Sequence, residues 1–115
     1  FQDGDIAVAK ISPCLENRKS MILNGLPNGI GAGTTELHVF RSSIVDARYA
    51  LYFFKSDYFI AQCIGTFNGV VGQQRVGQSV IEDIVFPLPP LEEQPRIACT
   101  ISVIFKHLDN ILSEL

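Results

Sequence analysis

The chain has 115 residues, of which 47% are hydrophobic, and its mean hydropathy is +0.24; this composition excludes a disordered chain and suffices for the core of one domain. The net charge of −3 argues against a uniformly basic nucleic-acid-binding surface. The charge is uneven, however, because residues 1–80 hold seven basic and six acidic residues, whereas residues 81–115 hold two basic and six acidic ones.

Neither a membrane span of about 18 apolar residues nor an N-terminal signal segment is present in the sequence, so we expect a cytoplasmic protein. The chain begins with Phe1, so we expect a piece of a longer protein. It holds three widely spaced cysteines, Cys14, Cys63 and Cys99. With His38 and His107 they lack the spacing of zinc ligands, which favours buried free thiols in a reducing compartment and predicts neither a metal site nor a cofactor.

The first part of the chain predicts short strands separated by turns. Residues 5–11 are mostly apolar and predict a strand buried on both faces. Pro13 begins a loop, after which residues 20–23 predict a second short strand. Residues 34–41 alternate in polarity and predict the clearest strand, in which we expect His38 to be half-buried and hydrogen-bonded.

Two short helices follow. Asp46 is a good N-cap for a helix from Ala47 to about Lys55. Ser56 is a second N-cap, and it predicts a helix over residues 57–63 that lies at an angle to the first one. Gly65 is expected to end this second helix.

Residues 66–77 are rich in glycine and predict a loop. Residues 80–88 predict the last strand, with Ile84 and Phe86 on one face. The adjacent carboxylates Glu82 and Asp83 would then point to opposite faces, which indicates solvated surface rather than an acid–base pair.

Residues 86–97 organise the rest of the chain. Pro87, Pro89 and Pro90 keep the backbone extended. Glu92 and Glu93 then favour a helix N-terminus, and Pro95 is tolerated only in the first helical turn. The prediction is a helix that begins close to Glu92.

This helix carries apolar residues at the alternating spacing of four and three that is typical of a coiled coil: Ile97, Ile101, Ile104, Leu108, Ile111 and Leu115. Phe105 and Leu112 widen the stripe, which indicates contact with more than one surface. The alternative is a C-terminal helix that lies on its own domain. Because the proline stretch projects the helix away, and a short isolated helix is marginal in water, we favour a partner helix.

The motifs of an enzyme active site are absent from the sequence, which predicts no catalytic residue. Its loops are instead rich in cations, amides and hydroxyls, the groups that bond phosphates and base edges. The candidate DNA-contacting residues are Lys10, Asn17, Arg18, Lys19, Thr34, Thr35, Asn68, Gln73, Gln74 and Arg75. The alternative is an ordinary polar surface, with Arg75 paired to Glu82, Asp83 or the tail.

Several blocks of the sequence, taken together, resemble one known family. They are Gly4-Asp5-Ile6, Lys10-Ile11-Ser12-Pro13-Cys14 with Glu16-Asn17, Asn28-Gly29-Ile30-Gly31, residues 34–39, Ser56-Asp57-Tyr58-Phe59, Gly65-Thr66, residues 72–76 and residues 86–94. The chain resembles the target-recognition domain of the specificity subunit of type I restriction-modification systems.

The resemblance implies a non-catalytic reader of duplex DNA. In such subunits two recognition domains are held apart by long helices, and each domain reads one half of a split target. The implied partners are adenine methyltransferase subunits, which bind S-adenosylmethionine and perform the chemistry, a restriction subunit, and a second spacer helix from the other half of the subunit or from a homodimer. Members of the family carry more sequence before Gly4, and they have a basic residue where this chain has Pro95.

We therefore predict an α+β fold: a curved, mostly antiparallel sheet with a helical pair, followed by a long coiled-coil-like spacer helix. Residues 1–90 would form the later part of a recognition domain, and residues 91–115 the spacer. Two alternatives remain. One is a protein-interaction module that dimerises through its tail without binding DNA, and the other is a fragment of a fused restriction-methylation enzyme.

Overall fold

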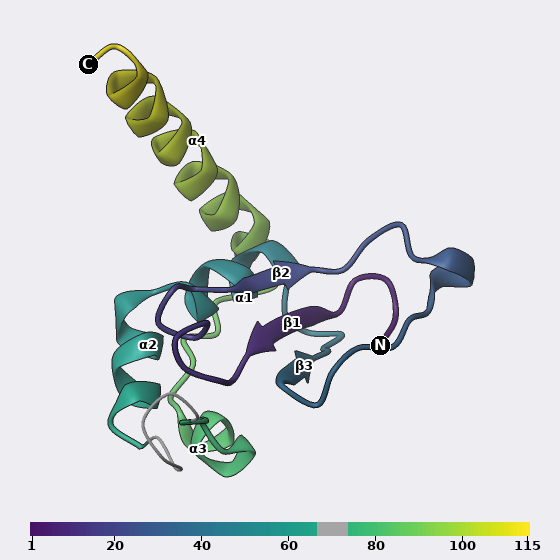
Figure 1. Ribbon diagram of the computed structural model, residues 1–115. Coiled ribbons are helices and arrows are strands. Elements are labelled where there is room, and N and C mark those ends of the chain that lie inside the picture. Colours follow the sequence, from purple (N-terminus) through teal and green to yellow (C-terminus); the bar gives the residue numbers. More distant parts are fainter. Residues whose placement is uncertain (67–73) are drawn as a thin grey trace.

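The computed structural model describes residues 1–66 and 74–115, and it shows an α+β head from which one long helix projects (Figure 1). This architecture confirms the predicted fold class. The elements in chain order are β1 (Ile6–Ala9), β2 (Ser20–Ile22), a short 3-10 helix (Pro27–Gly29), β3 (Leu37–Phe40), α1 (Ala47–Phe54), α2 (Asp57–Ile64), α3 (Gln78–Asp83) and α4 (Glu93–Ser113).

The sheet is antiparallel, and its strand order is β2-β1-β3. All four residues of the central strand β1 are buried, as its sequence predicts. Because side chains alternate along a strand, Ile6 and Val8 face the helices, and Ala7 and Ala9 face the other side. The strand predicted over residues 34–41 is present but shorter.

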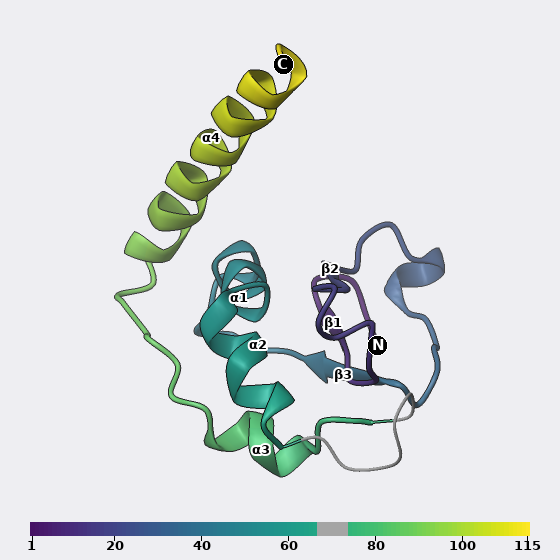
Figure 2. The same cartoon turned by 60° about the vertical axis from the view of Figure 1, so that its left-hand side comes forward.

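The helical pair α1 and α2 lies against one face of the sheet (Figure 2). Both predicted N-caps are confirmed. The carboxylate of Asp46 accepts a hydrogen bond from the Tyr49 N–H at 3.0 Å, and the Ser56 hydroxyl accepts one from the Phe59 N–H at 3.2 Å. Gly65 follows the last residue of α2, as predicted.

The core lies between the sheet and this helical pair, and aromatic rings fill much of it. The ring of Phe54 packs edge-on against those of Phe40 and Phe59, with centroids 5.2 and 5.1 Å apart. Phe53 packs against Phe86 at 4.6 Å, which brings the extended chain before α4 into the same cluster. Each such pair contributes about 0.5–1.5 kcal/mol beyond its buried area.

The prediction of a last strand over residues 80–88 is wrong. Residues 78–83 form α3, and the chain is extended only from Ile84 onwards. Val80, Ile81 and Ile84 pack against the core, a spacing that fits one face of a helical turn and not one face of a strand. Glu82, expected on a strand, accepts a hydrogen bond from Gln78 one turn earlier at 2.8 Å.

The cysteines and His38 lie in different surroundings. Cys63 is buried, Cys14 is half-buried and Cys99 is exposed, so the expectation of buried thiols holds for Cys63 and is wrong for Cys99. The Nε2 atom of His38 lies 2.9 Å from the carbonyl oxygen of Val76, and the residue is half-buried, as predicted.

Candidate nucleic-acid interface

The antiparallel register places the predicted DNA-contacting residues at one end of the sheet. The last residue of β1, Ala9, pairs with the first residue of β3, Leu37, and β2 begins at Ser20 opposite Val8. The segment after β1 and the segments before β2 and β3 therefore leave the sheet at the same end. These segments carry Lys10, Asn17, Arg18, Lys19, Thr34 and Thr35.

Gln74 and Arg75 join this end because residues 74–76 run beside the chain that follows β1. The Ser12 N–H donates to the Gln74 carbonyl at 2.7 Å, and the Val76 N–H donates to the Lys10 carbonyl at 2.9 Å. The structure thus brings together the predicted residues that it describes. Two further predicted residues, Asn68 and Gln73, lie outside the described part of the chain.

The loop between β1 and β2 is a compact turn whose tip is exposed. Leu15 is buried and anchors the loop, and the Lys19 N–H donates to the Cys14 carbonyl at 3.1 Å. Asn17 and Lys19 are exposed, and Arg18 between them has a φ of 56°, in the left-handed region. A non-glycine residue holds this conformation only where its surroundings fix it.

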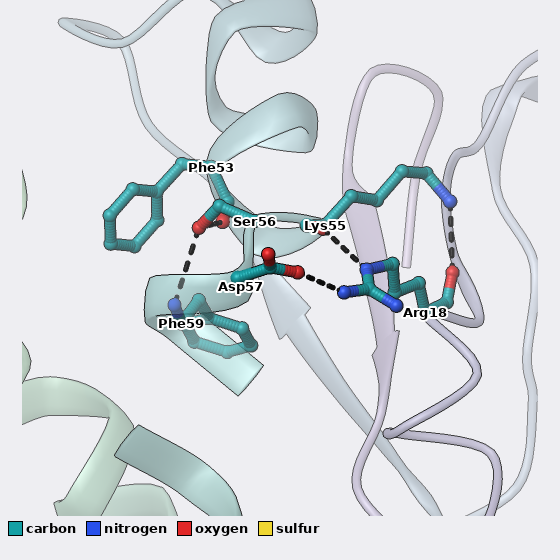
Figure 3. A network of polar contacts seen from close by, with 6 residues as sticks. All are labelled: Arg18, Phe53, Lys55, Ser56, Asp57 and Phe59. Atoms are coloured by element: carbon teal, nitrogen blue, oxygen red, sulfur yellow. Dashed lines mark hydrogen bonds and ion pairs between the residues drawn. The ribbon is translucent and has the colours of Figure 1, made fainter. Parts of the chain in front are cut away.

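Arg18 is fixed by a reciprocal clamp with the junction of α1 and α2 (Figure 3). Its Nε donates to the Lys55 carbonyl at 2.9 Å, and its guanidinium forms an ion pair with the carboxylate of Asp57. In return, the Lys55 ammonium donates to the Arg18 carbonyl at 2.9 Å. The guanidinium predicted to touch DNA is therefore engaged in holding the loop.

Lys55 was not predicted from the sequence, and it adds a third cation to this corner. Burial lowers the pKa of Lys55, and the nearby positive charge of Lys19 lowers it further. The Lys55 ammonium bonds the carbonyl of Arg18, the residue directly before Lys19, and this keeps the two lysines in one corner. Such a concentration of positive charge is favoured next to an anion.

Arg75 is held in a similar way. It forms a two-pronged ion pair with Glu36, with nitrogen–oxygen distances of 2.7 Å on both prongs. The hydrogen bonds from Arg75 hold the pKa of Glu36 below its ordinary value, and the charge of Lys10 contributes to this. An ion pair for Arg75 is the alternative considered from the sequence, but its partner is Glu36 rather than Glu82, Asp83 or the tail.

A hollow of about 820 Å³ lies between β3 and α3, beside Arg75. Its apolar lining includes Val8, Phe54, Phe59 and Ile81, and its polar lining includes Lys10, Arg41, Arg75 and Glu82. Cations thus outnumber carboxylates in this lining. Two of them, Arg41 and Arg75, are paired with carboxylates of the head.

The predicted helix ridge lies along α4, which leaves the head at its first turns (Figure 1). Ala98 is fully buried against the head, and the ring of Phe105 lies 5.9 Å from that of Tyr52. Beyond these contacts the ridge is exposed: Ile104 is 53% exposed and Leu108 is 48% exposed. Ile111 and Leu115 are exposed too, Ile97 is 37% exposed, and Ile101 is half-buried.

Two structural roles were missed from the sequence because their partners are remote along the chain. Asp5 is buried and receives two hydrogen bonds from Arg41, both at 2.7 Å, which tie β1 to the end of β3. Gln94 is buried at the base of α4. Its position after two glutamates, at a helix start, gave the only hint of a special role.

Over residues 1–66 and 74–115, the structure holds no cluster of three potential metal ligands among its histidine, cysteine, aspartate and glutamate side chains. Within the same ranges, none of the helices has the length and apolar character needed to cross a membrane.

Comparison with known families shows the class of protein to which this fold and site belong. The family described as "Type I restriction modification DNA specificity domain" matches residues 28–115, and the chain belongs to this family.

Two curated relatives, both from Escherichia coli, place the chain further. It is 45% identical over 113 residues to the type I restriction enzyme EcoAI specificity subunit, and 44% identical over 113 residues to the EcoEI specificity subunit. Each alignment covers 96% of this chain and 19% of the relative, so the chain spans about a fifth of the relatives' length. No solved structure matches the chain.

Proposed function

We propose that this chain is a DNA-reading part of a type I specificity subunit, and that it binds duplex DNA with the end of its sheet. The observation that carries the proposal is the register of the sheet together with the bridge from Ile11 to Arg75, which bring candidate contacts from three separate segments to one end. Cations at such an end suit phosphates, and amides and hydroxyls suit base edges.

Within this end we assign different tasks to different residues. Lys19 and Lys10 would contact phosphates, and Asn17 and Gln74 would offer amides to base edges. Arg18 and Arg75 would mainly hold their loops, because each is engaged by a carboxylate of the head. The other proposed contacts are Thr34, Thr35, Asn68 and Gln73.

We further propose that residues 1–90 and residues 91–115 divide the work between them. The first part would read DNA, and the exposed ridge of α4 would bind a second spacer helix, from the other half of the subunit or from a homodimer. The whole assembly would include methyltransferase subunits, which bind S-adenosylmethionine, and a restriction subunit. This chain would be a non-catalytic component acting in the cytoplasm.

A mobility-shift titration with random-sequence duplex at several salt concentrations tests the proposal. Lys19→Ala should weaken binding and reduce the slope of log affinity against log salt by about 1, because one phosphate contact is lost. Lys106→Ala is the matched control, since it removes an exposed lysine from α4 and should leave both quantities unchanged.

The same titration distinguishes the alternative. A protein-interaction module that dimerises through α4 would show no shift with duplex at low salt, and Lys19→Ala would then have nothing to weaken. A reader that sits on a fused catalytic chain would behave as proposed, and only the sequence beyond this chain separates the two.

A further inference from the structure

The base of α4 is held by a buried glutamine that the proposed DNA contacts leave unexplained. Gln94 is fully buried, and its side chain reaches three backbone groups. Its Oε1 accepts from the Asp46 N–H at 2.6 Å, and its Nε2 donates to the carbonyls of Ile44 at 3.2 Å and Pro89 at 3.0 Å. These groups belong to the start of α1 and to the extended stretch before α4.

Only a side-chain amide satisfies this set of partners. One backbone N–H needs an acceptor and two carbonyls need donors, and a glutamine carries both kinds of group at the right reach. A methionine has a similar length but would leave all three groups unpaired. A glutamate would keep the acceptor and would place a negative oxygen against two carbonyl oxygens.

The surrounding contacts extend the same junction. The Tyr49 hydroxyl donates to the Pro87 carbonyl at 2.7 Å, so the proline stretch lies along α1. Ala98, one turn after Gln94, is fully buried, and Phe105 packs near Tyr52 two turns later. The proline stretch is therefore attached to the head through the carbonyls of Pro87 and Pro89, and α4 leaves the head from a fixed base.

We propose that Gln94 is a positioning residue that fixes the direction of α4 relative to the sheet end. The functional meaning of this role rests on the proposed function. Partners bound to α4 can act at a fixed position on the DNA only if the angle between α4 and the DNA-binding end of the sheet is fixed. Because Gln94 is fully buried within the chain, we assign it no contact with DNA or with a partner.

The test measures the distance between the head and α4 on the full chain by double electron–electron resonance between two spin labels. Nitroxide labels are placed at Ala61→Cys on α2 and Asn110→Cys on α4, both exposed, in a Cys14→Ser, Cys99→Ser background. Cys63 can stay, because it is buried and burial raises the pKa of its thiol to about 11. Dilution with unlabelled chain removes distances between molecules.

The parent chain should give one narrow distance distribution. Gln94→Met should broaden it several-fold while the far-ultraviolet circular dichroism and the affinity for random duplex stay unchanged. Gln2→Met, which changes an exposed glutamine of the head, is the matched control and should keep the narrow distribution. Gln94→Glu is the second variant, and its distribution should be broad at neutral pH.

Either of two results would overturn the proposal. One is a folded Gln94→Met or Gln94→Glu chain whose distance distribution is as narrow as that of the parent. The other is loss of the folded head in both variants, which would make Gln94 a determinant of stability alone. Neither depends on DNA: a parent chain that fails to shift duplex refutes the proposed function and leaves the distance measurement valid.

Discussion

Asp5 shows how one buried carboxylate links the stability of the head to pH. Its side chain is 2% exposed, and the hydrogen bonds from Arg41 lower its pKa from 3.8 to about 2, against the opposing effect of burial. Because the folded-state pKa is depressed, the ionised group stabilises the fold above its ordinary pKa. This stabilisation is lost as the pH falls through the folded-state value.

We therefore predict that Asp5→Asn lowers the thermal unfolding midpoint near neutral pH. The difference in midpoint from the parent should shrink as the pH falls from above 3.8 towards about 2. Unfolding followed by circular dichroism across this range checks the prediction, with Asp109→Asn, an exposed aspartate of α4, as the control. A difference that stays constant with pH would contradict the role of the Asp5 charge.

The individual arginines show where sequence reasoning stops. The chemistry of the loops was enough to name Arg18 and Arg75 among the candidate DNA contacts. Their partners, Asp57 and Glu36, are each 39 residues away along the chain, and nothing local selects them among twelve carboxylates. Which cations are engaged within the head depends on tertiary contacts, and so the division between Lys19 and its neighbour Arg18 emerges only from the fold.

At the scale of single elements, Ser56 makes a quantitative prediction. Its hydroxyl accepts from the Phe59 N–H at the start of α2 and donates to the Phe53 carbonyl at 2.6 Å (Figure 3). Ser56→Ala should lower the free energy of unfolding by about 1 kcal/mol, the usual cost of losing an N-cap. Urea unfolding measures this, and Ser79→Ala, an exposed serine within α3, should cost less than about 0.5 kcal/mol.

Caps and prolines made the boundaries of α1, α2 and α4 predictable, because each acts on the few residues beside it. The error at α3 has a different origin. Val80, Ile81 and Ile84 fit one face of a short helix, whereas Ile84 and Phe86 fit a strand, and so short a run contains both patterns. The choice was made by the core, which accepts Val80 and Ile81 on the same side.

At the scale of the whole molecule, α4 has two sides with different surroundings. One side, with Gln94 and Ala98, packs on the head, and the neighbouring ridge remains exposed from Ile104 onwards. Phe105, which widens the stripe, packs near Tyr52 of the head, and contact of the stripe with a second surface stays a prediction. We propose that this exposed apolar ridge is a site of association between proteins.

Matched substitutions on the two sides of α4 test this division. Leu108→Glu on the exposed ridge should change the free energy of unfolding by less than about 0.5 kcal/mol. It should also weaken self-association of the chain by at least about tenfold, because a leucine removed from such a contact costs about 1.5–3 kcal/mol. Ala98→Glu should instead destabilise the junction by more than about 2 kcal/mol, because its carboxylate would be buried without a partner.

Sedimentation equilibrium and urea unfolding of the same three proteins separate the two effects. Loss of association without loss of stability in Leu108→Glu, and the opposite order of effects in Ala98→Glu, would establish that the ridge is a protein-binding surface and that the other side belongs to the head. If Leu108→Glu sediments as the parent does, the ridge is not the contact. If the ridge of α4 binds protein, the end of the sheet stays free to bind the duplex, as the proposed function requires.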